Sequence, residues 1–232
     1  MRLDKYLADM NLGTRKEVKS LIKNKLVKVN DEIITKADFN VHEKDTVKVN
    51  DEVISYVQYE YILLHKPGNY ICANEDKIYP TVFELIESKR KDLFTVGRLD
   101  VDTEGLLLIT NDGTLAHRLI SPKYHVDKKY YAKLKNALIP DAQDILENPM
   151  DLGDFITKGA KFEKISSNEA YLTIDEGKYH QVKRMFEKID NEVVYLKRIS
   201  FAFLSIDDIE ISKWRYLSDD ELNNLKKLVG LV

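Results

Sequence analysis

The chain of 232 residues has little of what builds several specialised classes of protein. Its single cysteine, Cys72, excludes an internal disulfide and also a zinc site made of several thiolates. Five prolines and nine glycines exclude collagen-like and proline-rich fibres. No run approaches the roughly 18 apolar residues of a membrane span, and the first residues lack the apolar core of a secretory signal. We therefore expect a reduced, cytoplasmic protein without a membrane segment.

What is present is a mixture typical of folded proteins. Hydrophobic residues make up 44% of the chain and charged residues 32%, which is enough to bury a core without disulfides. The length fits one medium domain plus one small domain better than two equal ones. Strand-like and helix-like segments follow one another without a regular βαβ rhythm. This pattern favours an α+β fold with a mixed, largely antiparallel sheet.

Charge is unevenly distributed along the chain. The net charge is −3, yet residues 1–50 hold 11 Lys and Arg against 8 Asp and Glu. Two runs, 14–30 and 118–135, each contain six basic residues and one acidic residue, whereas 141–154 contains five acids and no base. A local basic patch can bind a polyanion even on an acidic protein, because charges are screened over about 8 Å at physiological salt. Each basic run is equally compatible with a solvated helix face, and we expect 141–154 to be solvated surface.

The amino-terminal residues predict a small α/β unit. Thr14 and Glu17 form a capping-box pattern that begins a helix. One face of this helix is apolar, and another carries cations at helical spacing. The apolar face comprises Val18, Leu21 and Ile22, and the cationic face comprises Arg15, Lys16, Lys19 and Lys23.

A strand–turn template follows that helix. The sequence VKVNDE occurs at 27–32 and again at 47–52, which predicts two similar hairpin segments. Residues 51–60 read as a linker. We expect a first domain over residues 1–55 and a second domain over residues 59–232.

The most unusual segment for chemistry is 97–106. Asp100, Asp102 and Glu104 alternate there in a loop bounded by glycines. A calcium loop does not fit, because the twelfth position is Asn111, where such a loop needs a bidentate glutamate. A carboxylate pair for glycoside hydrolysis and a capped turn with solvated acids both remain open from the spacing alone.

Two further segments combine basic and aromatic residues. In 176–186 a glycine-containing turn leads into a helix whose first turn carries His180, Gln181, Lys183 and Arg184, a pattern that attracts anions. Residues 121–130 suit phosphate contact together with base stacking. An exposed basic helix turn and an ordinary loop are the simpler readings. The histidines lack metal-ligand spacing, and no phosphate-binding glycine motif occurs, so we expect neither metal nor nucleotide cofactor.

Three long motifs resemble a known family. They are GRLDVDTEGLLLITNDG (97–113), SPKYHVDKKY (121–130) and EGKYHQVKRMF (176–186). Together they resemble the RsuA-type branch of the pseudouridine synthases, and YILLHKPGNYICA (61–73) resembles the first strand of the catalytic domain there. The amino-terminal unit resembles the S4 RNA-binding domain. Lys183 departs from the arginine that many relatives carry.

The resemblance implies an isomerase that converts a uridine in RNA to pseudouridine without cofactor or metal. The enzyme breaks the N1–C1′ bond, turns the uracil and rejoins it through C5. Asp100 matches the catalytic nucleophile, Tyr130 the tyrosine that packs on the target base, and Lys183 the cation that pairs with the aspartate. These residue types suit the chemistry, because a carboxylate is a competent nucleophile, a neighbouring cation favours its ionised form, and a flipped base needs an aromatic or apolar platform.

The resemblance also implies a partner. The motif variants indicate ribosomal RNA of the small subunit (16S) as substrate, bound by a monomer. A sister enzyme acting on large-subunit RNA and a non-catalytic RNA-binding ribosome-assembly factor are the alternatives. Asp102 and Glu104 are expected to shape the loop or face RNA. The residues expected to contact RNA are Arg15, Lys16, Lys19, Lys23, Lys28, Arg98, Lys128 and Arg184.

Overall fold

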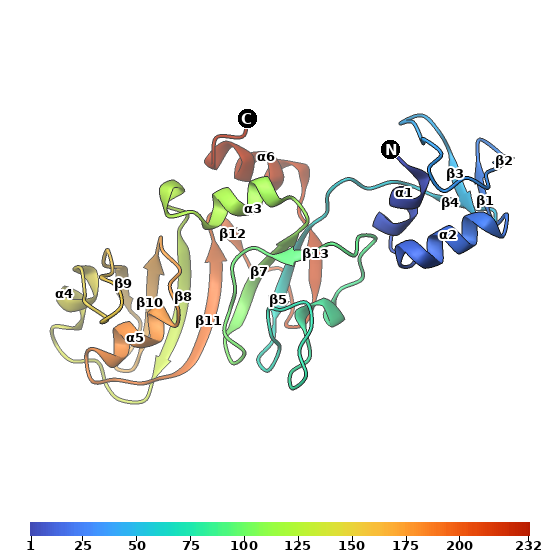
Figure 1. Ribbon diagram of the computed structural model, residues 1–232. Coiled ribbons are helices and arrows are strands. Elements are labelled where there is room, and N and C mark those ends of the chain that lie inside the picture. The colour runs from blue at the N-terminus through green and yellow to red at the C-terminus, as the bar shows by residue number, and fades with distance from the viewer. The chain divides into compact units, whose positions relative to one another are not determined.

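The computed structural model describes residues 1–232 and divides the chain into two compact units (Figure 1). Unit 1 contains Met1–Glu60 together with Glu87–Leu93, and unit 2 contains Tyr61–Ile86 and Phe94–Val232. The chain therefore returns from unit 2 to unit 1 once, over Glu87–Leu93, before it completes unit 2. No pattern in the sequence predicts that excursion.

Unit 1 combines two helices with a four-stranded antiparallel sheet. The sheet order is β2-β1-β3-β4, and the two VKV segments, β1 and β3, pair with each other. Both NDE turns have the same left-handed backbone, with φ of 52° and 68° at Asn30 and Asp31 and of 50° and 68° at Asn50 and Asp51. The prediction that one strand–turn template is used twice is confirmed. The bounds are α1 (Leu3–Asp9), α2 (Arg15–Lys23), β1 (Val27–Val29), β2 (Glu32–Ile33), β3 (Val47–Val49) and β4 (Glu52–Ile54).

The segment expected as a linker is therefore partly a strand. Residues 51–60 begin with the turn and with β4, because the repeated template extends the pairing of β3 by a further strand.

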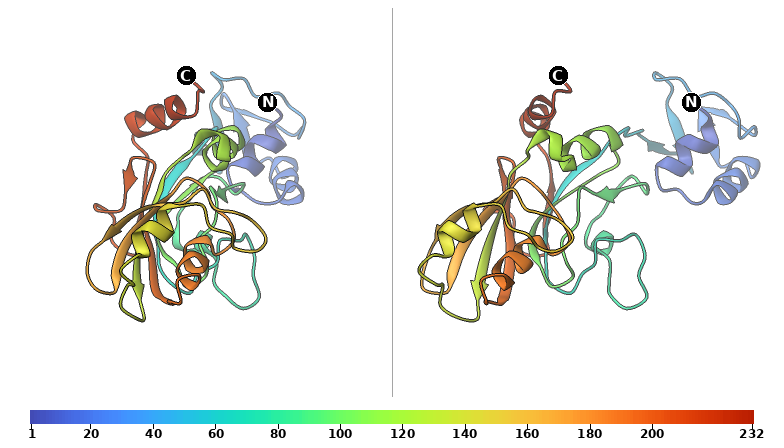
Figure 2. Two further views of the ribbon diagram at one scale, coloured as in Figure 1. Left: turned by 90° about the vertical axis from the view of Figure 1, so that its left-hand side faces the viewer. Right: turned by 60° about the vertical axis from the view of Figure 1, so that its left-hand side comes forward.

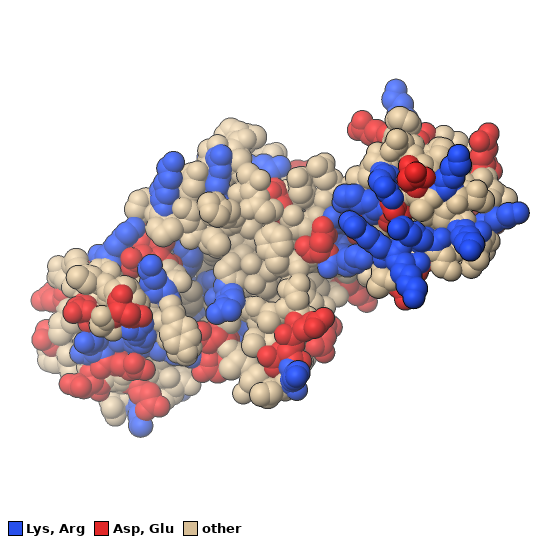
Figure 3. Space-filling view, in the orientation of Figure 1, with Lys and Arg blue, Asp and Glu red and all other residues tan.

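The helix α2 begins as its sequence predicts. The Thr14 backbone N–H donates to Glu17 Oε2 at 2.6 Å, and the Glu17 N–H donates to Thr14 Oγ1 at 3.3 Å. Val18 and Ile22 are fully buried in the core of unit 1 together with Leu3 and other apolar residues of α1 and the sheet. The cationic stripe of α2 consequently faces solvent, and Lys and Arg side chains gather over this part of unit 1 (Figure 3).

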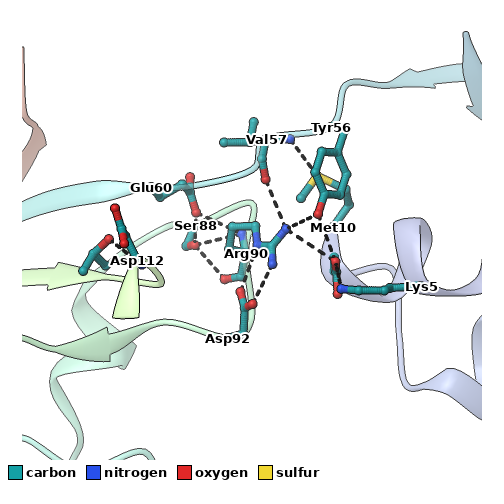
Figure 4. A network of polar contacts seen from close by, with 11 residues as sticks. Lys5, Met10, Tyr56, Val57, Glu60, Ser88, Arg90, Asp92 and Asp112 are labelled. Carbon is teal, nitrogen blue, oxygen red and sulfur yellow. Dashed lines mark hydrogen bonds and ion pairs between the residues drawn. The ribbon is translucent and has the colours of Figure 1, made fainter. Parts of the chain in front are cut away.

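Arg90 holds the returning segment Glu87–Leu93 within unit 1 (Figure 4). Its guanidinium is almost fully buried and donates to the Val57 carbonyl and the Tyr56 hydroxyl, each at 3.1 Å. It also pairs with Asp92. A buried arginine needs such partners for its charge and its donors, so this network fixes the segment to the end of the amino-terminal sheet.

Unit 2 is built around one sheet of nine strands. Its main path runs β13-β5-β7-β11-β8-β10-β9, with β12 on β11 and β6 on β7. Only the β7–β11 pair is parallel, which confirms the expected α+β fold with a mixed, largely antiparallel sheet. The strands are β5 (Tyr61–Lys66), β6 (Phe94–Thr95), β7 (Glu104–Thr110), β8 (Lys128–Leu134), β9 (Lys161–Lys164), β10 (Glu169–Ile174), β11 (Val193–Phe201), β12 (Leu204–Ser205) and β13 (Trp214–Tyr216).

Two helices cover one face of this sheet (Figure 1 and Figure 2). Leu63 of β5 and Leu108 of β7 are buried in one cluster with Leu115 and Leu119 of α3 (Gly113–Ile120) and Leu225 of α6 (Asp219–Leu228). The remaining helices are α4 (Ala142–Glu147), α5 (Gln181–Glu187) and the short 3-10 turns η1 (Val82–Leu85) and η2 (Pro122–Tyr124). None of the helices combines the length and apolar character needed to cross a lipid bilayer.

The acidic run 141–154 is not only the solvated surface that we expected from the sequence. It contains α4, whose Ala142 and Leu146 are buried, and it packs against β9. The acids lie on the outer side of that helix and in the loop after it, so the run has both an apolar inner face and a charged outer face.

Candidate active site

A buried lysine holds the backbone of the loop before β7, residues 97–103. Lys66, at the end of β5, is fully buried, and its Nζ donates to the carbonyl oxygens of Asp100, Val101 and Thr103 at 3.1, 3.2 and 2.8 Å. The Thr103 N–H closes a turn on the Asp100 carbonyl at 3.1 Å. Three loop carbonyls thus converge on one ammonium group, which sets the backbone from which the Asp100 side chain projects.

Lys66 was not identified as a site residue from the sequence. Burial lowers its pKa from the ordinary lysine range, although the carboxylates of Asp102 and Asp100 act in the opposite direction. One signal in the sequence points to it. Lys66 ends an apolar strand directly before Pro67-Gly68, and a cation in such a position is costly to bury unless it has partners.

Gly105 brings the strand after this loop close to β11. Its φ is +114°, and a Cβ there would lie 2.2 Å from the Arg198 carbonyl oxygen. No other residue fits this approach, so the glycine after Glu104 is required for the parallel β7–β11 contact that carries the loop.

Asp100 and Lys183 form the predicted ion pair. The Lys183 Nζ lies 3.1 Å from Asp100 Oδ2, and His180 Nε2 lies 3.4 Å from Asp100 Oδ1. Lys183 also donates to both oxygens of Asp102, at 2.8 and 3.0 Å. One ammonium therefore joins two of the three alternating acids, while Glu104 accepts a hydrogen bond from the Tyr195 hydroxyl.

Lys183 determines the protonation of its partner Asp102. Burial lowers the pKa of Lys183, but its hydrogen bonds with Asp102 and Asp100 outweigh burial and raise that pKa above the usual range. Burial likewise raises the pKa of Asp102, and the hydrogen bond from Lys183 outweighs it, so the net direction is down. Lys183 is therefore protonated and Asp102 ionised at neutral pH.

Asp100 lies at a small cleft lined by apolar and polar side chains in similar measure. Tyr130 of β8 lines this cleft and is only 7% exposed, which places its ring at the wall. Arg98, an exposed residue, lies at the rim. The apolar walls come from Leu99, Ile174, Val182 and Leu196. A carboxylate beside a cleft with apolar and aromatic side chains suits nucleophilic attack on a ligand that carries a planar ring.

The predicted RNA-contact residues of unit 1 are at its surface. Lys28 is half-exposed and pairs with Asp51 at 2.6 Å, so this lysine already has a carboxylate partner. The other four lie on or beside the exposed stripe of α2, and they are Arg15, Lys16, Lys19 and Lys23.

Two of the predicted residues in unit 2 differ from expectation. Lys128 is buried, and its Nζ donates to the Val126 carbonyl at 2.7 Å, while burial lowers its pKa to about 8. This position does not agree with a contact to RNA, because the ammonium points into the protein. Arg184 pairs with Asp154 and donates to the Leu152 carbonyl at 2.6 Å, so it secures the loop after α4.

Comparison with known proteins shows the family of the chain. Residues 60–188 match the family model for RNA pseudouridylate synthase, and residues 1–47 match the S4 domain. The chain belongs to the RNA pseudouridylate synthase family. It is therefore an isomerase with an S4 domain at its amino terminus, as the sequence resemblance implied.

Relatives of this synthase match over nearly the whole chain. The ribosomal small subunit pseudouridine synthase A of Vibrio parahaemolyticus is 39% identical over 97% of this chain and 99% of its own length. The ribosomal large subunit pseudouridine synthase B of Bacillus subtilis is 36% identical over 98% of this chain and 96% of its own length. A solved structure described as a pseudouridylate synthase covers 99% of this chain and all of its own, with a TM-score of 0.68 and 34% identity.

Proposed function

We propose that this synthase isomerises one uridine of small-subunit (16S) ribosomal RNA to pseudouridine, without cofactor or metal. The full-length similarity to a small subunit synthase A supports this substrate. In this proposal residues 1–55 form the RNA-binding domain and residues 59–232 the catalytic domain, although the segment Glu87–Leu93 packs with the former. The enzyme works as a monomer in the cytoplasm.

The arrangement around Asp100 carries the proposal. Its carboxylate is the nucleophile, and Lys183 pairs with it at 3.1 Å. The carboxylate attacks C1′ and forms a bond to it as the N1–C1′ bond breaks. The freed uracil turns in the cleft against Tyr130. C5 then attacks C1′, so the C1′–C5 bond forms as the Asp100–C1′ bond breaks. One hydrogen ion leaves C5 and one is added to N1, so the reaction is an isomerisation with no net loss of atoms.

Cations at the rim of the cleft and on unit 1 position the RNA. Arg98 at the rim contacts the flipped nucleotide or its phosphates. Lys28 exchanges Asp51 for a phosphate group on binding. Phosphate contacts give affinity and register rather than base identity. The remaining backbone contacts come from Arg15, Lys16, Lys19 and Lys23.

The substrate is tested by mapping the product. Unmodified small-subunit and large-subunit RNA are incubated separately with the protein, each as naked RNA and with assembling ribosomal proteins. Pseudouridine is then mapped with a carbodiimide that blocks reverse transcription. We expect one new site, in small-subunit RNA. A site in large-subunit RNA would instead support the sister activity, for which the full-length match to synthase B is the supporting observation. No site in any sample would favour a non-catalytic RNA-binding factor.

A further inference from the structure

His180 has an unusual backbone directly before α5. Its φ and ψ are 49° and 29°, a left-handed conformation that few residues other than glycine adopt. Its side chain makes no hydrogen bond that caps the helix. The ring instead stacks on Tyr179, with 3.9 Å between centroids and an interplanar angle of 16°. The backbone bend thus directs the imidazole away from the helix and toward Asp100.

Both oxygens of Asp100 face side chains from this one turn of chain. His180 Nε2 faces Oδ1 at 3.4 Å, and Lys183 Nζ faces Oδ2 at 3.1 Å. Lys183 is shared with Asp102, which takes two of its hydrogen bonds at shorter distances. Rotation of a carboxylate about its last bond has only broad minima, so a single shared cation on one oxygen leaves the plane of the group loosely defined.

We propose that His180 is a positioning residue that fixes the plane of the Asp100 carboxylate through the approach of its Nε2 to Oδ1 at 3.4 Å. This inference rests on the proposed function, in which Asp100 is the nucleophile. The charged groups facing the imidazole are Asp100 and, beyond it, Lys183 and Asp102, while Lys178 and Arg98 line the same cleft. A nucleophile oriented before the substrate arrives lowers the cost of reaching the reactive geometry.

A purely structural role of His180 predicts a different ranking of the variants at this position. If His180 served only the left-handed bend, asparagine would be the best replacement, because it tolerates that backbone well. Asparagine is too short to reach Asp100, since its amide nitrogen corresponds to Nδ1 of histidine. Glutamine places its amide nitrogen close to the position of Nε2 but tolerates the bend less well. The two roles therefore rank these variants in opposite orders.

The test compares His180→Gln with His180→Asn and with wild type. Rates and KM are measured on the small-subunit RNA that wild type modifies, after thermal unfolding has shown that each variant is folded. We expect His180→Asn to lower kcat by about 10- to 100-fold with KM unchanged, as for a nucleophile displaced by up to an ångström. His180→Gln should stay within a few-fold of wild type. A His180→Asn enzyme as fast as His180→Gln, or faster, would overturn the inference.

Crystal structures of the two variants give a readout that needs no substrate. The Asp100 carboxylate should keep its plane in His180→Gln and turn in His180→Asn. The same plane in both variants would contradict the positioning role. Wild type that modifies no RNA would count against the proposed function alone, because the carboxylate plane would still decide the role of His180.

Discussion

Replacing Lys66 with methionine should loosen the loop that carries Asp100. Methionine keeps the length and apolar stem but removes the ammonium donor. The carbonyls of Thr103 and Pro67 then lose a partner, whereas those of Asp100 and Val101 keep the N–H groups of Thr103 and Asn69. Two acceptors left unpaired cost about 2–6 kcal/mol, and the recovered desolvation of the ammonium offsets part of this, which leaves a net loss of about 1–3 kcal/mol.

The effect of Lys66→Met on stability can be followed at one residue. Trp214 is the single tryptophan, and it lies in β13, which pairs with β5 next to Lys66. Its fluorescence during urea unfolding therefore reports on unit 2. A loss of about 1–3 kcal/mol would lower the midpoint by about 0.5–1.5 M, given a slope of about 2 kcal/mol per M.

The effect on catalysis should be large as well. A shift of the Asp100 backbone by about 1 Å should reduce kcat about 100-fold with little change in RNA affinity. Lys135→Met is the matched control, because Lys135 is exposed and pairs with Glu192 at the surface, and its loss should change the free energy of unfolding little. A Lys66→Met enzyme with the unfolding midpoint and kcat of the control would refute the view that Lys66 holds the loop.

Two further predictions concern RNA binding and acid stability. Arg15→Ala combined with Lys19→Ala should weaken RNA binding and reduce the slope of log affinity against log salt by about 2, since each lost phosphate contact removes about 0.9; an unchanged slope would remove α2 from the interface. The hydrogen bonds from Arg215 lower the pKa of Glu221 to about 2. A lowered carboxyl pKa stabilises the fold above the unfolded value near 4.3 and loses that contribution as pH falls toward 2. Glu221→Gln should therefore cost about 3 kcal/mol at pH 7 and almost nothing at pH 2, and an equal cost at both would contradict the ion pair.

Elements with a strong local signal were predicted well from the sequence. The capping box of Thr14 and Glu17 placed the start of α2, and apolar spacing from Val182 to Ile189 placed α5. The pattern of residues 94–99 predicts a strand there, but β6 is shorter because Gly97 turns the chain with φ of +71° after Thr95.

Elements with a weak or overlooked signal were missed. Helix α4 buries only Ala142 and Leu146 among many acids, too few apolar residues to show a helical period. Helix α6 was missed although Ser218 and Glu221 form a capping box, a signal that was present in the sequence.

The site shows a similar division. The pairing of Asp100 with Lys183 follows from long motifs and is present in the structure. Charge patterns alone could not show that Lys128 points inward, because burial depends on which face of β8 meets the core. The contact between His180 and Asp100 joins residues 80 positions apart and depends on a left-handed backbone angle, which no local pattern in the sequence specifies.

The central claim is that Asp100 carries out the isomerisation of a uridine in RNA. The most direct test is release of tritium from RNA labelled at uracil C5, because that hydrogen must leave when C5 joins the sugar. We predict release from small-subunit RNA with wild type and none with Asp100→Asn, which should still fold and bind the RNA. Asp100→Asn activity within about tenfold of wild type would contradict the assignment of the nucleophile, whose loss should cost several orders of magnitude.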